Sequence, residues 1–157
     1  MPFSGYLNKQ IKLNMKPLHL LFLVLLTSCS FPQDSKDSLE KAKQDGLKVG
    51  IVVNPPYAIY NNGTAWGSEV QLIEQFAAQE GLKVTYVPGP ESMLVKQMED
   101  YKLHLIIGGF EKNTVWKDKA GLTTRYNDKN VILIAKGENK LLYRLESTLL
   151  KHKQNGS

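Results

Sequence analysis

Short apolar segments alternate with segments of helical periodicity from Leu47 to the end of the chain. The short segments are typical of buried strands and lie at 48–53, 82–87, 103–107 and 131–135. Apolar residues at helical spacing predict helices that begin at Ser68, at Pro90 and near Leu141. Helical crossovers between such strands favour parallel pairing with right-handed connections. The pattern therefore predicts an α/β fold: a single three-layer domain with a mostly parallel sheet of four or five strands flanked by helices.

The segments between these elements carry turn and solvation signals. The stretch from Tyr57 to Trp66 is expected to be a loop, with a tight turn at Asn61-Asn62-Gly63. A short helix is expected near Val115 to Lys119. Residues 30–46 are rich in Ser, Asp, Lys and Gln, which predicts a solvated tether that becomes helical near Leu39 to Gln44.

The start of the chain has the composition of an export signal. It contains Lys9, Lys12 and Lys16 but no acidic residue before Cys29, and an apolar stretch follows the lysines at 18–26. That stretch is too short to span a bilayer and fits the apolar region of a signal peptide. The expected organisation is a signal peptide at 1–28, a tether at 29–46 and a domain at 47–157.

The signal ends in Leu26-Thr27-Ser28-Cys29, which resembles the lipobox of bacterial lipoproteins. In that motif the cysteine carries the lipid, so the resemblance implies a membrane anchor at Cys29 and a location in the periplasm or cell envelope. Ser30 after the cysteine implies the outer membrane if the organism is Gram-negative. The alternative is an ordinary secretory signal with an incidental thiol, and Met15 is an alternative start to Met1.

Composition and motif content narrow the classes of function. The single cysteine excludes an internal disulfide framework and a cysteine-rich zinc site. The formal net charge of +5 falls to +2 without the three lysines of residues 1–28, and the other lysines are scattered among acids, so nucleic-acid binding is not expected. Glu69, Glu111 and His104 are the candidate acid–base groups, but they lie on different predicted elements with no motif linking them. We therefore expect no catalytic residue, no cofactor and no metal.

Candidate binding residues follow the first and third predicted strands. Ligands of open α/β sheets bind beyond the carboxyl ends of the strands, where loop amides and helix N-termini converge. Gly108 and Gly109 would let backbone N–H groups approach a bound group closely. Walls and polar contacts would come from Tyr57, Trp66, Phe110, Asn113, Thr114 and Trp116. The alternative is that the aromatic residues cover the sheet ends and the glycines only turn the chain.

Five segments together resemble a known family in their order and spacing. They are Leu47-Lys48-Val49-Gly50 leading to Pro55-Pro56-Tyr57, then Gly67-Ser68-Glu69-Val70-Gln71-Leu72, Glu80-Gly81-Leu82-Lys83-Val84, Leu105-Ile106-Ile107-Gly108-Gly109 and Thr123-Thr124-Arg125-Tyr126. From Leu47 to Gly156 the chain is similar to the first lobe of the family 3 extracellular solute-binding proteins, which have the type 2 periplasmic-binding fold. The resemblance implies that Tyr57 stacks on the ligand, that Gly109 and Phe110 offer backbone hydrogen bonds, and that Glu69 lies at the rim.

The chain departs from this family at the expected ligand clamp. Trp116 stands where amino-acid binders have an arginine, and Asn113 stands where they have a hydroxyl residue. A neutral indole cannot make the bidentate contact that fixes a carboxylate, so Trp116 favours an aromatic, apolar or cationic ligand, or a structural plug. Arg125 is either a substitute anion contact or a solvated charge, and His104 is expected to be structural.

The second lobe of the family is missing. In two-lobed relatives the chain leaves after the position of Tyr126 and returns at a strand resembling the one at Val131; here departure and return are fused. The resemblance implies a single-lobe form that binds solute weakly, or completes its site with a second copy or another protein. The expected function is capture of a small amino-acid-like, polar or aromatic solute for an ABC importer or sensor by a lipid-anchored protein that is not an enzyme. The alternatives are a protein-interaction module and, third, a lyase or dehydratase-like enzyme.

Overall fold

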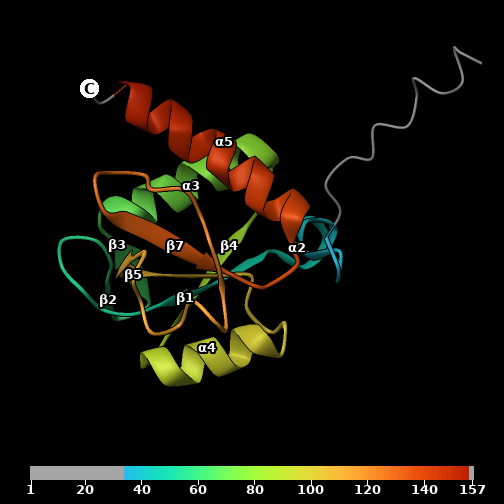
Figure 1. Ribbon diagram of the computed structural model, residues 1–157, viewed down its shortest axis with the longest axis horizontal. Coiled ribbons are helices and arrows are strands. Elements are labelled where there is room, and N and C mark those ends of the chain that lie inside the picture. The colour runs from blue at the N-terminus through green and yellow to red at the C-terminus, as the bar shows by residue number, and fades with distance from the viewer. Residues whose placement is uncertain (1–33, 156–157) are drawn as a thin grey trace, which may run out of the picture. The chain divides into compact units, whose positions relative to one another are not determined.

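The computed structural model describes residues 34–155, and Figure 1 labels its elements except β6. The helices are α2 (Ser38–Asp45), α3 (Ser68–Glu80), α4 (Glu91–Glu99) and α5 (Asn139–Asn155). The strands are β1 (Leu47–Ile51), β2 (Ile59–Asn61), β3 (Thr64–Trp66), β4 (Val84–Pro88), β5 (Leu105–Glu111), β6 (Gly121–Leu122) and β7 (Asn130–Ile134). Within the described residues, no helix is long and apolar enough to cross a membrane. The expected signal peptide and Cys29 lie outside the described residues.

Five strands form the main sheet, in the order β4-β1-β5-β7-β6. β4, β1 and β5 are parallel, whereas β7 is antiparallel to β5 and β6 is antiparallel to β7. The prediction of a mostly parallel α/β sheet is confirmed for the part of the chain with helical crossovers. The short helix expected near Val115 to Lys119 is wrong, because these residues form turns. Without a helical crossover, β7 returns antiparallel beside β5.

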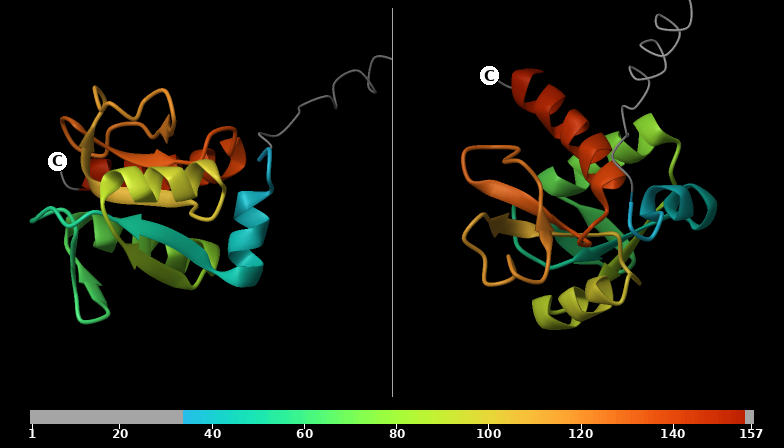
Figure 2. Two further views of the ribbon diagram at one scale, coloured as in Figure 1. Left: turned by 90° about the horizontal axis from the view of Figure 1, so that it is seen from below. Right: turned by 45° about the vertical axis from the view of Figure 1, so that its right-hand side comes forward.

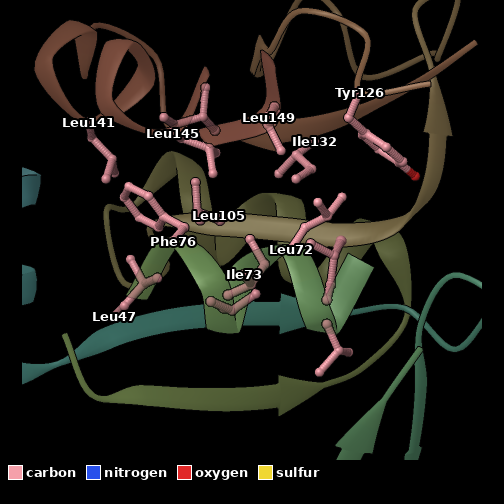
Figure 3. Close-up of a cluster of buried hydrophobic side chains, with 14 of the residues drawn as sticks. Leu47, Leu72, Ile73, Phe76, Leu105, Tyr126, Ile132, Leu141, Leu145 and Leu149 are labelled. Carbon is pink, nitrogen blue, oxygen red and sulfur yellow. The ribbon is translucent and has the colours of Figure 1, made fainter. Parts of the chain in front are cut away.

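Helices cover both faces of the sheet. Figure 1 shows α3 and α5 on one side and α4 on the other. Leu105 and Ile107 of β5 belong to the core on the α3 and α5 side, whereas Ile106 belongs to the core on the α4 side. This alternation follows from the period of two along a strand. Figure 3 shows α3 and α5 side chains meeting over the sheet, with Tyr126 at one end of the cluster.

The segment predicted as a loop from Tyr57 to Trp66 contains the hairpin of β2 and β3. Asn61 pairs with Thr64, and the two residues between them have positive φ, 48° at Asn62 and 82° at Gly63. An Asn-Gly pair favours this two-residue turn because both residues tolerate left-handed backbone. The predicted tight turn is therefore confirmed. In the left view of Figure 2 the hairpin projects from the lobe, at the end toward which the β1 arrow points.

The segment expected to be a solvated tether is packed against the domain from Asp34 onward. Leu39 and Ala42 of α2 are buried in the same core as α3 and α5. The segment is therefore only partly solvated: Asp34 faces the protein together with the apolar side chains, whereas Lys41, Gln44 and Asp45 remain exposed. The compact unit accordingly includes residues before Leu47.

Two buried carboxylates cap the N-termini of α2 and α5 reciprocally. Asp34 accepts hydrogen bonds from the backbone N–H of Leu39 through Oδ2 (2.9 Å) and of Lys140 through Oδ1 (2.6 Å). Glu138 accepts from the backbone N–H of Lys36 (2.9 Å) and of Ser38 (3.1 Å). Each carboxylate thus satisfies N–H groups that a helix leaves without an internal partner. We call this arrangement of Asp34 and Glu138 the helix-end clamp.

Candidate functional site

A buried glutamate organises the carboxyl end of β5. Glu69 at the start of α3 is 0% exposed, so it does not lie at the expected rim. Its Oε2 accepts hydrogen bonds from the N–H groups of Gly108 (2.6 Å) and Gly109 (2.9 Å). Its Oε1 accepts from the hydroxyl of Tyr126 (2.6 Å), whose oxygen points away from the leucines in Figure 3. The glycine N–H groups that the sequence analysis offered to a ligand are therefore bound to the protein's own carboxylate.

Burial is the largest influence on the pKa of the Glu69 carboxylate. Removal from water raises the pKa of Glu69, and the hydrogen bonds from Tyr126, Gly109 and Gly108 oppose that rise. Burial raises the pKa of the Tyr126 hydroxyl, and the neighbouring Glu69 carboxylate raises it further. Glu69 is thus a strongly hydrogen-bonded internal group that joins α3, β5 and the segment before β7.

The raised pKa of Glu69 predicts a specific pH dependence of stability. Because the folded state holds the proton more tightly, this contribution to the free energy of unfolding is full below the unfolded pKa of about 4.3 and is lost as pH rises through the folded pKa. The difference in free energy of unfolding between wild type and Glu69→Gln should therefore fall as pH increases from about 4. Urea titrations from about pH 4 to pH 8 measure this difference. A difference that grows with pH would contradict the direction of the shift.

Tyr57 lies against Gly109 at the carboxyl end of β1. A Cβ on Gly109 would lie 2.5 Å from Cδ2 of Tyr57 and 2.8 Å from Nδ2 of Asn54, so only glycine lets the ring approach this closely. Asn54 donates from Nδ2 to the carbonyl of Gly108 (2.8 Å), and the carbonyl of Tyr57 accepts from the N–H of Glu69 (2.9 Å). We call Asn54, Tyr57, Gly108 and Gly109 the tyrosine platform. Tyr57 is half-buried and remains partly accessible at this end of the sheet.

The Phe110 side chain and the carbonyl of Gly109 both have partners within the protein. The Phe110 side chain is 7% exposed and belongs to the core under α4, so it does not form a wall of an open site. Asn130 donates from Nδ2 to the carbonyl of Gly109 (3.0 Å). Asn130 was not among the predicted site residues; its signal in the sequence is an amide directly before the apolar run of β7, and it pairs with Glu111 at the end of β5.

Trp116 is fastened to α4. It is half-buried against the core under α4, and its indole Nε1 donates to Oε2 of Glu91 (2.7 Å). The Nζ of Lys119 lies 5.9 Å from the ring centroid. Thr114 accepts from the N–H of Trp116 (3.4 Å) and so helps shape the same turn. Of the two roles expected for Trp116, this geometry favours the structural one.

Trp66 lies apart from these buried groups. It ends β3, pairs with Ile59 across the hairpin and is 45% exposed. Val53 after β1 and Val115 in the loop after β5 are also exposed, at 54% and 80%. These side chains leave apolar surface near the carboxyl ends of the strands.

A pocket of about 400 Å³ lies beside the end of β5. Its lining residues are Glu111, Lys112, Asn113, Arg125 and Lys129. The structure thus brings together Asn113 and Arg125, two residues of the predicted site that are separated in sequence. Lys112 and Lys129 were not predicted as site residues, because nothing in the pattern of a solvated lysine marks its position in a pocket. Glu111 and Lys129 form an ion pair across it (3.5 Å).

The chain closes directly where a second lobe would be inserted. Asn127 accepts hydrogen bonds at Oδ1 from the N–H groups of Lys129 (3.0 Å) and Asn130 (2.7 Å). The N–H of Tyr126 donates to the carbonyl of Asn130 (3.2 Å). These contacts form a compact turn between the end of the loop and β7. The expected fusion of departure and return is confirmed.

His104 lies at the opposite end of β5 from the pocket. Its Nδ1 accepts a hydrogen bond from the N–H of Lys48 (2.9 Å), and burial lowers its pKa. These contacts agree with the structural role expected for His104.

Comparison with solved structures agrees with this architecture. The arginine-bound form of domain 1 of TmArgBP, from T. maritima, has 24% sequence identity and a TM-score of 0.64, with 71% of this chain and 97% of that chain covered. The ancestral amino-acid-binding protein AncCDT-1, a precursor of cyclohexadienyl dehydratase, has 14% identity and a TM-score of 0.69, with 76% and 94% covered. An ancestral cyclohexadienyl dehydratase has 23% identity and a TM-score of 0.51, with 57% and 38% covered, so enzymes also occur on this fold. No curated protein sequence matches the chain.

The family assignment rests on the sequence itself. The model of the bacterial extracellular solute-binding proteins, family 3, matches residues 47–156. That range contains every strand of the sheet, the tyrosine platform and the pocket. This chain is therefore a single-lobe member of family 3 of the bacterial extracellular solute-binding proteins.

Proposed function

We propose that this protein captures a small solute at the carboxyl end of its sheet. The single observation that carries the proposal is the pocket of about 400 Å³ beside the end of β5, within the size range of small-molecule sites. The tyrosine platform includes Gly109, which precedes the pocket residue Glu111 on β5. It adds the partly accessible ring of Tyr57, which lies against Gly109. A single domain of TmArgBP described as arginine-bound supports the idea that one lobe can hold a solute.

The proposal includes where the protein acts and what it serves. The family is extracellular, and the motif at Cys29 supports a lipid anchor in the periplasm or cell envelope, in the outer membrane if the organism is Gram-negative. The solute would pass to an ABC importer or a sensor. A permease or a second copy would cover the open side of the pocket. Ligands bound by one lobe alone keep more exposed surface, so weak binding is expected without that cover.

A protein-interaction module is the second candidate. The exposed apolar side chains of Val53, Trp66 and Val115 favour it, because each follows or ends a strand and is available to a partner. An enzyme has less support from the side chains. Glu69 is fully occupied by internal hydrogen bonds, and His104 lies at the other end of β5 from Glu111.

Solute capture at the platform can be tested with two matched glycine variants. Gly109→Ala places a Cβ against Tyr57 at a φ of 73°, whereas Gly63→Ala adds a Cβ at a similar φ of 82° with nothing within 4 Å. If the platform binds solute, Gly109→Ala should weaken binding by roughly tenfold or more, and Gly63→Ala should leave it unchanged.

The measurement begins with the full chain purified in detergent. Native mass spectrometry shows whether a small molecule or a second copy co-purifies. A thermal-shift screen with the protein amino acids, short dicarboxylates and aromatic acids then identifies a solute for calorimetry of both variants. A monomer whose melting temperature no solute shifts would count against capture and favour the interaction module. Equal affinity of wild type and Gly109→Ala would remove the platform from the site.

A further inference from the structure

Cationic side chains from two separate segments meet at the pocket beside β5. Lys112 follows the end of β5, whereas Arg125 and Lys129 flank the turn before β7. Nζ of Lys129 forms an ion pair with Oε1 of Glu111 at 3.5 Å. The side chains of Arg125 and Lys112 make no hydrogen bond or ion pair with any residue of the described range 34–155. The pocket lining therefore carries more positive than negative charge, and the N–H groups of Arg125 and Lys112 are available to a ligand.

We infer that this pocket binds a small solute that carries two carboxylates and one ammonium group, an inference that rests on the proposed function. The planar guanidinium of Arg125 matches the two oxygens of a carboxylate, and Lys112 supplies a second cation for the other carboxylate. The carboxylate of Glu111, which already pairs with Lys129 through one oxygen, supplies its other oxygen as the acceptor for the ammonium group. The amide of Asn113 can donate to or accept from either end of such a ligand.

The charge pattern disfavours two simpler ligands relative to a ligand with both charges. A purely anionic group such as inorganic phosphate would meet the Glu111 carboxylate as well as the cations. A cationic solute such as arginine would place its guanidinium among Lys112, Arg125 and Lys129. Like charges at short range weaken binding, and the field of the cations attracts acids from solution. This chain therefore differs in ligand charge from its arginine-bound structural neighbour.

Calorimetry on the full chain in detergent tests the inference with defined probes. L-Glutamate carries the proposed groups, glutarate lacks the ammonium, and L-glutamine lacks one carboxylate. We expect L-glutamate to bind best, with glutarate and L-glutamine each weaker by several-fold or more. L-Arginine and inorganic phosphate should bind more weakly still. The affinity for L-glutamate should fall as ionic strength rises, because the contacts are exposed to salt.

Charge variants assign the binding to this pocket. Arg125→Ala should weaken L-glutamate binding by roughly tenfold, as expected for the loss of a charge-assisted contact. Glu111→Gln should narrow the preference for L-glutamate over glutarate. Lys83→Ala is the matched control, because it removes an exposed cation before β4, at the other end of the sheet. All of these side chains are exposed, so the variants should fold as wild type does.

The outcomes separate the inference from the proposed function. Binding of L-arginine or a neutral amino acid without L-glutamate would overturn the acidic ligand and leave solute capture standing. Binding of L-glutamate that Arg125→Ala leaves unchanged would overturn the assignment to this pocket. Phosphate binding as tight as L-glutamate would overturn the role of Glu111. Absence of binding by every solute tested would overturn both proposals.

Discussion

Replacing Glu69 with alanine is expected to lower the free energy of unfolding by about 3–5 kcal/mol. The change removes the acceptor for three donors, the N–H groups of Gly108 and Gly109 and the hydroxyl of Tyr126. Each buried donor left without a partner costs about 1–3 kcal/mol, and a water entering the space would recover part of that. No buried side-chain polar atom in residues 34–155 lacks a partner in the native protein, so the variant creates a defect where none exists.

Two further variants show whether the hydrogen bonds or the charge of Glu69 contribute to the free energy of unfolding. Glu69→Gln keeps an oxygen for the glycine N–H groups and presents an amide to the Tyr126 hydroxyl, which can rotate to accept. Its cost should be well below that of alanine. Tyr126→Phe removes one of the three donors and should cost about 1–2 kcal/mol. Urea unfolding at pH 7 measures all three, and a Glu69→Ala variant as stable as Glu69→Gln would show that the contacts contribute little.

Deleting residues 34–46 is expected to destabilise the domain even though the family match begins at residue 47. The deletion exposes the core that Leu39 and Ala42 cover. It also removes Asp34, which accepts from the N–H groups of Lys140 and Leu141 at the start of α5. Leu39→Ala alone should cost about 2–5 kcal/mol because this side chain is 1% exposed. The whole deletion should cost more, and a chain without the segment is expected to be largely unfolded at 37 °C.

Thermal unfolding and amide hydrogen exchange provide the measurements for this second prediction. Exchange at the N–H groups of Lys140 and Leu141 should accelerate in the deletion, because their acceptor is lost. Asp34→Asn is a milder comparison, since one of its two terminal atoms remains an acceptor. Lys36→Ala serves as the control, because Glu138 bonds its backbone rather than its side chain. A deleted chain with the wild-type melting temperature would restore the idea of a solvated tether.

Most of the fold could be predicted from the sequence because its determinants are local. The segment 48–53, predicted as a strand from its apolar residues and the following Pro55-Pro56, overlaps β1, and the Asn62-Gly63 pair has the backbone preference that its turn requires. The direction of β7 could not be predicted from such patterns. It depends on the loop after β5 forming turns instead of a helix, with Trp116 of that loop bonded to Glu91 of α4.

The candidate site was less predictable, because burial of polar groups is decided by partners distant in sequence. A glutamate at the start of a helix is usually exposed, and only the convergence of Gly108, Gly109 and Tyr126 makes burial of Glu69 favourable. The same limit applies to the pocket. Asn113 and Arg125 were expected to contribute, whereas the place of Lys129 depends on the compact turn at Asn127.

The helix-end clamp has a consequence for the order in which the chain can fold. Apart from the local bond between Leu39 and Asp34, its hydrogen bonds join residues about a hundred positions apart, from Lys36 with Glu138 to Asp34 with Leu141. Such contacts close only after almost the whole chain is available, and they form late for reasons of loop entropy. A chain exported amino end first would therefore leave α2 undocked until α5 has followed it. The lobe would reach its final fold only once the polypeptide is complete, and not when its first helix forms.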